Sequence, residues 1–188
     1  VEMARRETGI ALEAERLAVG AISLHVVQAG PVDGMPLVLL HGFPDAAFVW
    51  DEVMQRLDGR VQCVAPNLRG YERSSAPVEV QAYRAKHLVT DIAALVGQLG
   101  APIDLLVAHD WGGAVAWAAA IARPERLARL VMINSPHPYL FWRELVNNPA
   151  QQKASEYMNV FRLPKAERVL SENGYARLRT AFGHLDAA

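Results

Sequence analysis

Short apolar runs alternate with helix-like segments from about residue 15 to residue 135, and this alternation limits the fold more than any other feature. The runs are rich in branched residues and have the length of strands buried on both faces: residues 37–40, 61–65, 105–108 and 130–133. Between them, apolar residues recur at helical spacing, and an alanine-rich helix is expected over residues 111–122. The pattern predicts an α/β fold, with a mostly parallel sheet that helices cover on both faces.

Two further segments flank this region. Residues 16–29 alternate between apolar and polar side chains around Gly20, which predicts an antiparallel hairpin at the start of the sheet. After Pro136 the strand pattern stops, and the segment to Ala188 is expected to be helical or irregular. We therefore expect residues 1–135 to form the sheet region and residues 136–188 to begin an inserted cap, or lid.

The overall composition argues against several classes of function. Of the 188 residues, 52% are hydrophobic and 21% are charged, so the chain can bury the core of a soluble globular protein. Its formal net charge of −1 and its scattered charges give no basic stripe for a nucleic-acid partner. No stretch approaches a membrane span, and the start lacks the apolar run of a secretory signal, so a cytoplasmic location is expected. The single cysteine, Cys63, excludes an internal disulfide and any cysteine-cluster metal site.

The sharpest local motif covers residues 108–113 (Ala-His-Asp-Trp-Gly-Gly), between an expected strand and an expected helix. It has the form of a nucleophile elbow, a strained turn that needs small residues two positions before and two and three positions after the nucleophile. Ala108, Gly112 and Gly113 meet this demand, so Asp110 stands where the nucleophile belongs. The alternative is that Asp110 is an ordinary helix N-cap, but capping does not explain three small neighbours.

An aspartate in this turn supports different chemistry from a serine. The following helix points its unpaired N–H groups and the positive end of its dipole at Asp110, which keeps the carboxylate ionised. A carboxylate can attack an epoxide or an alkyl halide directly at saturated carbon and form an ester with the enzyme. Because no Gly-x-Ser-x-Gly is present, serine esterase chemistry at this turn is excluded. His109, directly before the nucleophile, is expected to point its side chain away from that of Asp110.

A second motif, residues 41–44 (His-Gly-Phe-Pro), directly follows the run 37–40 and lies where an oxyanion hole belongs. The backbone N–H groups of Phe43 and Trp111 would stabilise the negative charge that develops when water attacks the enzyme ester. His41 is expected to be a buried residue whose ring bonds nearby backbone and shapes this loop, and not the catalytic base.

With these two motifs, the chain resembles the epoxide-hydrolase branch of the α/β-hydrolase superfamily from about Leu17 to its end. Four stretches appear in the family's order and rough spacing: His41-Gly42-Phe43-Pro44, Asn67-Leu68-Arg69-Gly70-Tyr71, His109-Asp110-Trp111-Gly112-Gly113 and Asn134-Ser135-Pro136-His137-Pro138. The resemblance implies that residues 1–135 are the N-terminal part of an α/β-hydrolase core and that residues 136–188 begin its cap. Asp110 then matches the family's aspartate nucleophile, and the N–H groups of Phe43 and Trp111 match its oxyanion hole.

The resemblance also implies a proton donor in the cap. Family members use two cap tyrosines to hold the epoxide oxygen; Tyr157 looks like the first, and the second has no match here. An acid is needed because the oxygen otherwise leaves as a strongly basic alkoxide. A packing aromatic is the alternative for Tyr157. The implied reaction is hydrolysis of a small hydrophobic epoxide by water to a vicinal diol, in a pocket lined by Phe43, Trp111 and Tyr157, with no metal and no organic cofactor.

Two other functional hypotheses stay open. The related haloalkane dehalogenases share the nucleophile, so dehalogenation of a haloalkane or haloacid is the main alternative, although Phe43 offers no side-chain donor to a halide. Asn134 stands where some relatives place the catalytic acid, and an asparagine cannot supply its charge. In the chain order nucleophile, acid, histidine, both later members are therefore expected beyond Ala188. The third hypothesis is accordingly an incomplete or inactive hydrolase-like fragment.

Missing core strands would leave a sheet edge unpaired. Such an edge invites association with the absent C-terminal portion or with a second copy of the chain. Two smaller departures from the family pattern are Asn67 and Glu72, where relatives usually have aspartate and glycine. They are expected to loosen only a structural loop.

Overall fold

The computed structural model of the chain describes residues 10–57, 59–100 and 102–181. The chain divides into two compact units, Val1–Pro138 and Tyr139–Ala188. The assignment of residues 136–188 to a cap stays a prediction.

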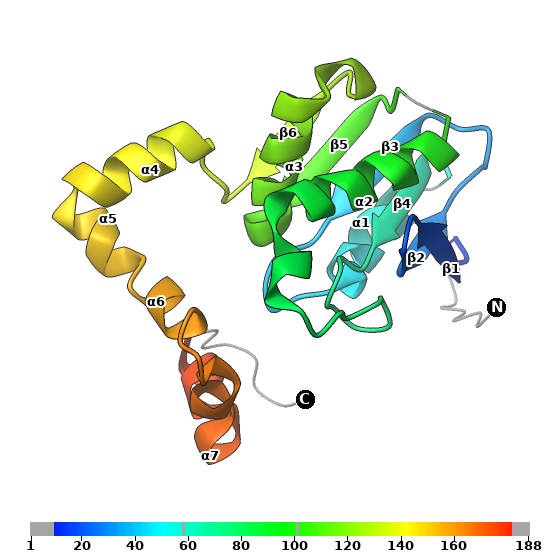
Figure 1. Cartoon of the computed structure of the whole chain (residues 1–188). Helices are drawn as coiled ribbons and strands as arrows, with labels where there is room; N and C mark the ends of the chain where they lie inside the picture. Colours follow the sequence, from blue (N-terminus) through cyan, green and yellow to red (C-terminus); the bar gives the residue numbers. More distant parts are fainter. Residues whose placement is uncertain (1–9, 58, 101, 182–188) are drawn as a thin grey trace. The chain divides into compact units, whose positions relative to one another are not determined.

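The first unit is built on a sheet that has six strands in the described part of the chain, in the order β1-β2-β4-β3-β5-β6 (Figure 1). They are β1 (Glu13–Val19), β2 (Ile22–Ala29), β3 (Pro36–Leu40), β4 (Gln62–Pro66), β5 (Leu105–His109) and β6 (Leu130–Ile133). β2 pairs in antiparallel fashion with β1 and β4, whereas β3 runs parallel to β4 and β5, and β5 runs parallel to β6. The predicted α/β class, opening hairpin and mostly parallel sheet are confirmed.

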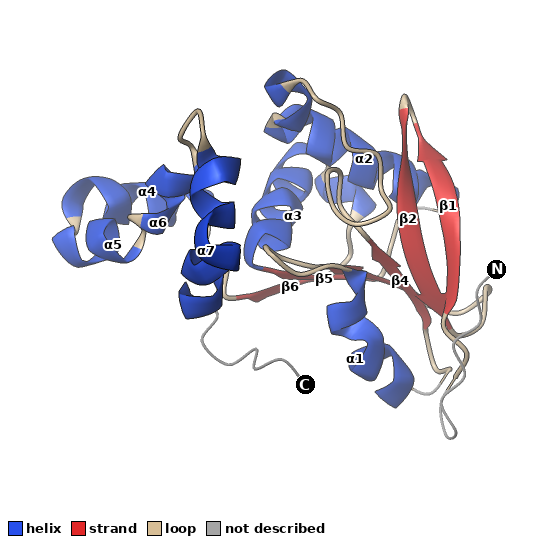
Figure 2. Cartoon of the chain, turned by 90° about the horizontal axis from the view of Figure 1, so that it is seen from below, coloured by secondary structure: helices blue, strands red, loops and turns tan. Residues whose placement is uncertain are grey.

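Helices cover both faces of this sheet, as predicted (Figure 2). α2 (Ala85–Gln98) and α3 (Asp110–Ala122) lie on one face, and α1 (Asp51–Arg56) lies on the other. Short 3-10 segments adjoin them: η1 (Ala47–Trp50), η2 (Val80–Tyr83) and η3 (Pro124–Arg126). α3 ends just before Arg123, which has left the helical conformation (φ −143°), because the ring of a following proline disfavours helix at the preceding residue.

Side-chain alternation along the strands sorts the apolar residues of the first unit into two cores. The core under α2 and α3 includes Leu24, Val38, Val64, Leu106, Leu88, Ile92 and Leu95. The core under η1 and α1 includes Leu37, Leu39, Cys63, Ala65, Trp50 and Met54. Full burial of one such leucine stabilises the fold by about 1.5–3 kcal/mol. The two cores hold β3 beside β5, so the loop after Leu40 meets the turn that follows His109.

The expected burial of residues 130–133 on both faces is wrong. Leu130 and Met132 pack against the core under α2 and α3. On the other face, Val131 and Ile133 are 44% and 39% exposed. β6 is an edge strand in the described part of the chain, and η1 on that face contacts β2, β3 and β4. An apolar run shows that a strand is suited to burial, but whether both faces are covered depends on which elements pack there.

The second unit is helical in its described part, as expected for residues beyond Pro136. Its elements are α4 (Pro138–Asn147), α5 (Pro149–Ala154), α6 (Tyr157–Phe161) and α7 (Ala166–Ala181), with a non-helical break in α7 at Glu172–Tyr175. Asn148 caps α5, because its Oδ1 accepts the backbone N–H groups of Ala150 (3.0 Å) and Gln151 (3.4 Å). Among the described helices, none combines the length and the apolar character that crossing a membrane requires.

Candidate active site

Asp110 occupies a strained turn between β5 and α3. Its φ of 49° lies in the left-handed region, which costs a residue with a side chain roughly 1–2 kcal/mol. Gly112 and Gly113 are small because each lies against a different part of the chain. A Cβ at Gly112 would overlap the His41 carbonyl oxygen, and a Cβ at Gly113 would overlap the Ser135 side chain. Glycine at both positions therefore lets α3 approach β3 and the segment after β6.

The Asp110 carboxylate faces the loop after β3. The Phe43 N–H donates to Asp110 Oδ1 over 3.0 Å, and this is the only hydrogen bond of the Asp110 carboxylate in the described part of the chain. A capping aspartate would instead accept N–H groups of its own helix, which Asp110 does not do. The N–H of Trp111 makes no bond to this carboxylate. The structure thus brings together Asp110 and one of the two predicted oxyanion-hole donors.

The loop at residues 41–44 is shaped by a buried histidine. The Leu68 N–H donates to His41 Nε2 over 3.0 Å, so Nε2 carries a lone pair and the proton must be on Nδ1. Nδ1 then donates to the Gly42 carbonyl oxygen over 2.9 Å. Burial lowers the pKa of His41, which agrees with a neutral ring. A side chain at Gly42 would overlap Asp110, and the Phe43–Pro44 peptide bond is cis.

Two other residues singled out in the sequence lie elsewhere. His109 is half-buried at the end of β5, and strand alternation places it on the face opposite Ala108, which belongs to the core under α2 and α3. Tyr157 lies in the second unit on α6, is 53% exposed, and packs edge-on against Phe161 with ring centroids 5.5 Å apart. Its role toward a substrate at Asp110 stays a prediction.

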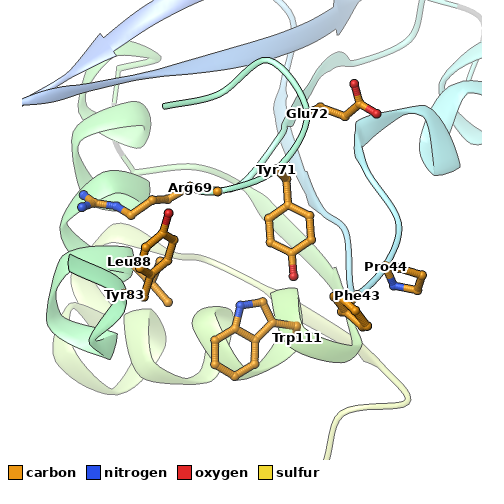
Figure 3. A pocket seen from close by; sticks show the side chains of 9 residues that line it. Phe43, Pro44, Arg69, Tyr71, Glu72, Tyr83, Leu88 and Trp111 are labelled. Carbon is orange, nitrogen blue, oxygen red and sulfur yellow. The ribbon is translucent and has the colours of Figure 1, made fainter. Parts of the chain in front are cut away.

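A cavity of about 480 Å³ opens beside the turn (Figure 3). Phe43, whose N–H holds the Asp110 carboxylate, and Trp111, the residue after Asp110, line it. The remaining wall is formed by Pro44, Arg69, Gly70, Tyr71, Glu72, Tyr83 and Leu88. Arg69, Gly70 and Tyr71 belong to the stretch 67–71 that carries part of the family resemblance, and the sequence suggests no function for it. The cavity gives that stretch a role, because it forms the wall opposite Trp111.

Arg69 is the one cation in the wall of this cavity, as far as the described residues show, and all three of its guanidinium nitrogens donate hydrogen bonds within the protein. Its Nε and Nη2 donate to the two Asp91 oxygens over 2.8 Å and 2.6 Å, and Nη1 donates to the Ala82 carbonyl over 3.1 Å. The two side chains are only 9% and 5% exposed, and the bond to Asp91 raises the pKa of Arg69. With Arg69 neutralised in this way, the carboxylates of Asp110 and Glu72 leave the cavity unfavourable to anionic ligands.

The expectation that Asn67 loosens a structural loop is wrong. Asn67 is buried, and its Oδ1 accepts the Ala47 N–H over 2.6 Å, while its Nδ2 donates to His25 Nδ1 over 3.0 Å. Its carbonyl accepts the Ser74 hydroxyl over 2.6 Å. The amide thus ties together β2, η1 and the loop after β4. It requires a neutral His25, whose pKa is lowered by burial and by nearby arginines.

Comparison with known proteins identifies the family of this chain. Residues 35–188 match the family model described as alpha/beta hydrolase fold. The chain is 40% identical over 167 residues to the AB hydrolase superfamily protein YfhM of Bacillus subtilis, covering 88% of this chain and 58% of that protein. It is 33% identical to Epoxide hydrolase 4 of Mus musculus, covering 89% of this chain and 47% of that protein.

Solved structures give the same result. A crystal structure of the Bacillus megaterium epoxide hydrolase with an inhibitor superposes with a TM-score of 0.83 at 35% identity, covering 89% of this chain and 58% of that one. An epoxide hydrolase from hot-environment metagenomes gives a TM-score of 0.80 at 39% identity, covering 85% and 54%. The chain spans about half the length of the curated relatives it matches. It belongs to the α/β-hydrolase fold family, in the branch that includes the epoxide hydrolases.

Proposed function

We propose that the protein hydrolyses a neutral epoxide to a vicinal diol through an ester on Asp110. The observation that carries this proposal is the Asp110 carboxylate itself. It stands on a strained turn and is followed by Trp111, which lines the cavity. Its Oδ1 is held by the N–H of Phe43, another residue of the cavity wall, and its Oδ2 has no hydrogen bond in the described part of the chain. A carboxylate oxygen without a bound donor is suited to attack at carbon.

In the first step, Oδ2 forms a bond to a ring carbon while the bond from that carbon to the epoxide oxygen breaks. The released oxygen takes a proton, for which we propose the Tyr157 hydroxyl. In the second step, water gives a proton to a base and adds to the ester carbonyl carbon, and negative charge develops on the oxygen that the Phe43 N–H already holds. A fixed donor of this kind contributes about 3–4 kcal/mol, and we propose the Trp111 N–H as the second. The intermediate then collapses: the bond between the carbonyl carbon and Oδ2 breaks, the diol leaves with Oδ2 and takes up a proton, and the carboxylate is restored.

The second step needs a general base, and we propose that the base and its acidic partner lie outside these 188 residues. Asn134, which follows β6, cannot supply the acid's charge, and Asp110 has no hydrogen bond to a histidine in the part of the chain described. The chain also spans about half the length of its curated relatives. The partner that supplies these groups is then the C-terminal portion of the fold, as a continuation or as an associated piece.

The experiment that tests the reaction combines mass spectrometry with product assay. After incubation with styrene oxide, the intact mass should rise by one substrate, and peptide mapping should place the label on Asp110, unless a base is present and diol accumulates instead. The isosteric variant Asp110→Asn should give neither label nor diol. Neither ester nor diol with the wild-type protein would rule the proposal out, and so would activity that survives in D110N.

Dehalogenation is the second candidate, and one observation favours it. The Trp111 side chain is 42% exposed and lines the cavity, where its indole N–H can donate to a departing halide. The paired Arg69 and the two carboxylates argue for haloalkanes over haloacids. Halide release from a chloroalkane, lost in Trp111→Phe but with no diol formed from epoxides, would reverse the order of the two candidates. The absence of both activities would leave an inactive hydrolase-like fragment.

A further inference from the structure

Tyr71 presents a hydroxyl group to the cavity beside Asp110. It lies in the loop after β4, and its phenol oxygen points toward Trp111 and Phe43 (Figure 3). The mechanism proposed above does not use it. In the described part of the chain this hydroxyl has no hydrogen-bond partner, whereas the other tyrosine of the cavity, Tyr83, donates to the Pro77 carbonyl over 2.9 Å.

The position of the Tyr71 ring is fixed from two sides. The ring meets His41 edge-on, with centroids 4.7 Å apart and planes at 74°, and His41 is itself held by Leu68 and Gly42. The backbone N–H of Tyr71 donates to the Leu68 carbonyl, and its carbonyl accepts the Ser74 N–H, both over 3.0 Å. A donor held in this way loses little conformational entropy when it binds a ligand.

The surroundings of Tyr71 also keep its hydroxyl group protonated, so that it can donate a hydrogen bond. Burial and the negative charges of Asp110 and Asp45 raise the pKa of Tyr71, so the phenol keeps its proton at neutral pH. A ligand that fills the cavity removes water from this hydroxyl. A ligand without an acceptor at that place therefore leaves a polar group unpaired, which opposes binding.

We propose that Tyr71 is a substrate-binding residue that selects neutral substrates with an oxygen acceptor, such as an ether, close to the reacting carbon. The Phe43, Trp111 and Leu88 side chains supply apolar walls for the remainder of the molecule. The inference rests on the proposed function, because it takes the cavity beside Asp110 as the substrate site. It adds a chemical requirement that the reaction itself does not impose.

The test uses unreactive product analogues, so that binding is measured separately from chemistry. The probes are the diol of phenyl glycidyl ether and its carbon isostere, in which a methylene replaces the ether oxygen. Calorimetry of the 188-residue chain should give a dissociation constant about fivefold lower for the ether. Tyr71→Phe should abolish this ratio by weakening the ether alone. Tyr83→Phe removes a hydroxyl that is already bonded and should leave the ratio unchanged.

A second measurement does not depend on the variant and therefore still tests the inference if Y71F fails to fold. With carbon-13 tyrosine in the wild-type protein, the Tyr71 ring resonance should shift more on addition of the ether diol than of the isostere. Equal dissociation constants in the wild type, a ratio that persists in Y71F, or no binding of either diol would overturn the inference. A preference that is lost in Y71F, together with neither an ester on Asp110 nor diol, would rule out the proposed reaction and leave the role of Tyr71 intact.

Discussion

Glu72 has a left-handed backbone, with φ of 43°, in the loop after β4. A residue with a Cβ is strained in this region by roughly 1–2 kcal/mol, and a change to glycine relieves that strain. The greater conformational entropy of glycine in the unfolded state offsets about 0.5–1 kcal/mol of this gain. We therefore expect Glu72→Gly to raise the free energy of unfolding by about 0.5–1 kcal/mol, measured by urea denaturation. Glu72→Ala is the matched control, since it removes the carboxylate but keeps the Cβ. An equal gain in both variants would assign the effect to charge.

His41 makes the stability of the protein depend on pH. Its pKa is lowered by burial from the ordinary 6.5, so below about pH 6.5 the unfolded chain binds a proton that the native chain does not. The free energy of unfolding should fall as the pH drops from 6.5 toward the native pKa, by up to about 1.4 kcal/mol per pH unit for this one proton.

His41→Gln keeps an acceptor and a donor but does not titrate. In urea denaturation between pH 7 and pH 5, its stability should decline less steeply than that of the wild type. Equal slopes for the two proteins would show that His41 titrates alike in both states. His25, whose pKa is also lowered, contributes a slope of the same sign that remains in the variant.

At the scale of elements, the Arg69–Asp91 pair joins the loop after β4 to α2. Both side chains are almost fully buried, so removing one partner leaves a charge without compensation. We expect Asp91→Asn to lower the free energy of unfolding by about 3 kcal/mol, measured by urea denaturation. The double variant R69M/D91L removes both charges and should recover most of that loss. A double variant less stable than D91N would contradict this account.

The strands and helices were predictable from the sequence, but much of the site was not. Runs such as residues 37–40 have the apolar character that a central strand requires, and the small residues around Asp110 follow from the geometry of its turn. These are local constraints. The pairing of Arg69 with Asp91 and the aim of Tyr71 into the cavity depend on how the loop after β4 packs against α2 and β3. No spacing pattern encodes such contacts between distant segments.

At the scale of the whole molecule, β5 and β6 expose an apolar strip toward the side of α1. Val131 and Ile133 are well exposed there, and Val107 is half-buried. Replacing both exposed residues by aspartate should change the stability of the 188-residue chain little, because few buried contacts are lost. It should reduce self-association at high concentration, measured by sedimentation velocity. Unchanged association in V131D/I133D would mean that this strip does not hold copies together.

Gly42 lies directly against the Asp110 side chain, although the two residues are far apart in the sequence. Phe43, the residue after Gly42, is 67 positions before Asp110. The space that a side chain at Gly42 would need is taken by the Asp110 Cβ and carboxylate. The loop after β3 and the turn after β5 therefore cannot be redesigned independently of each other. A longer nucleophile such as glutamate would have to extend away from Gly42, whereas serine or cysteine is smaller than aspartate and would leave part of that space empty. Conversion of this turn to another chemistry thus has to begin with both loops together.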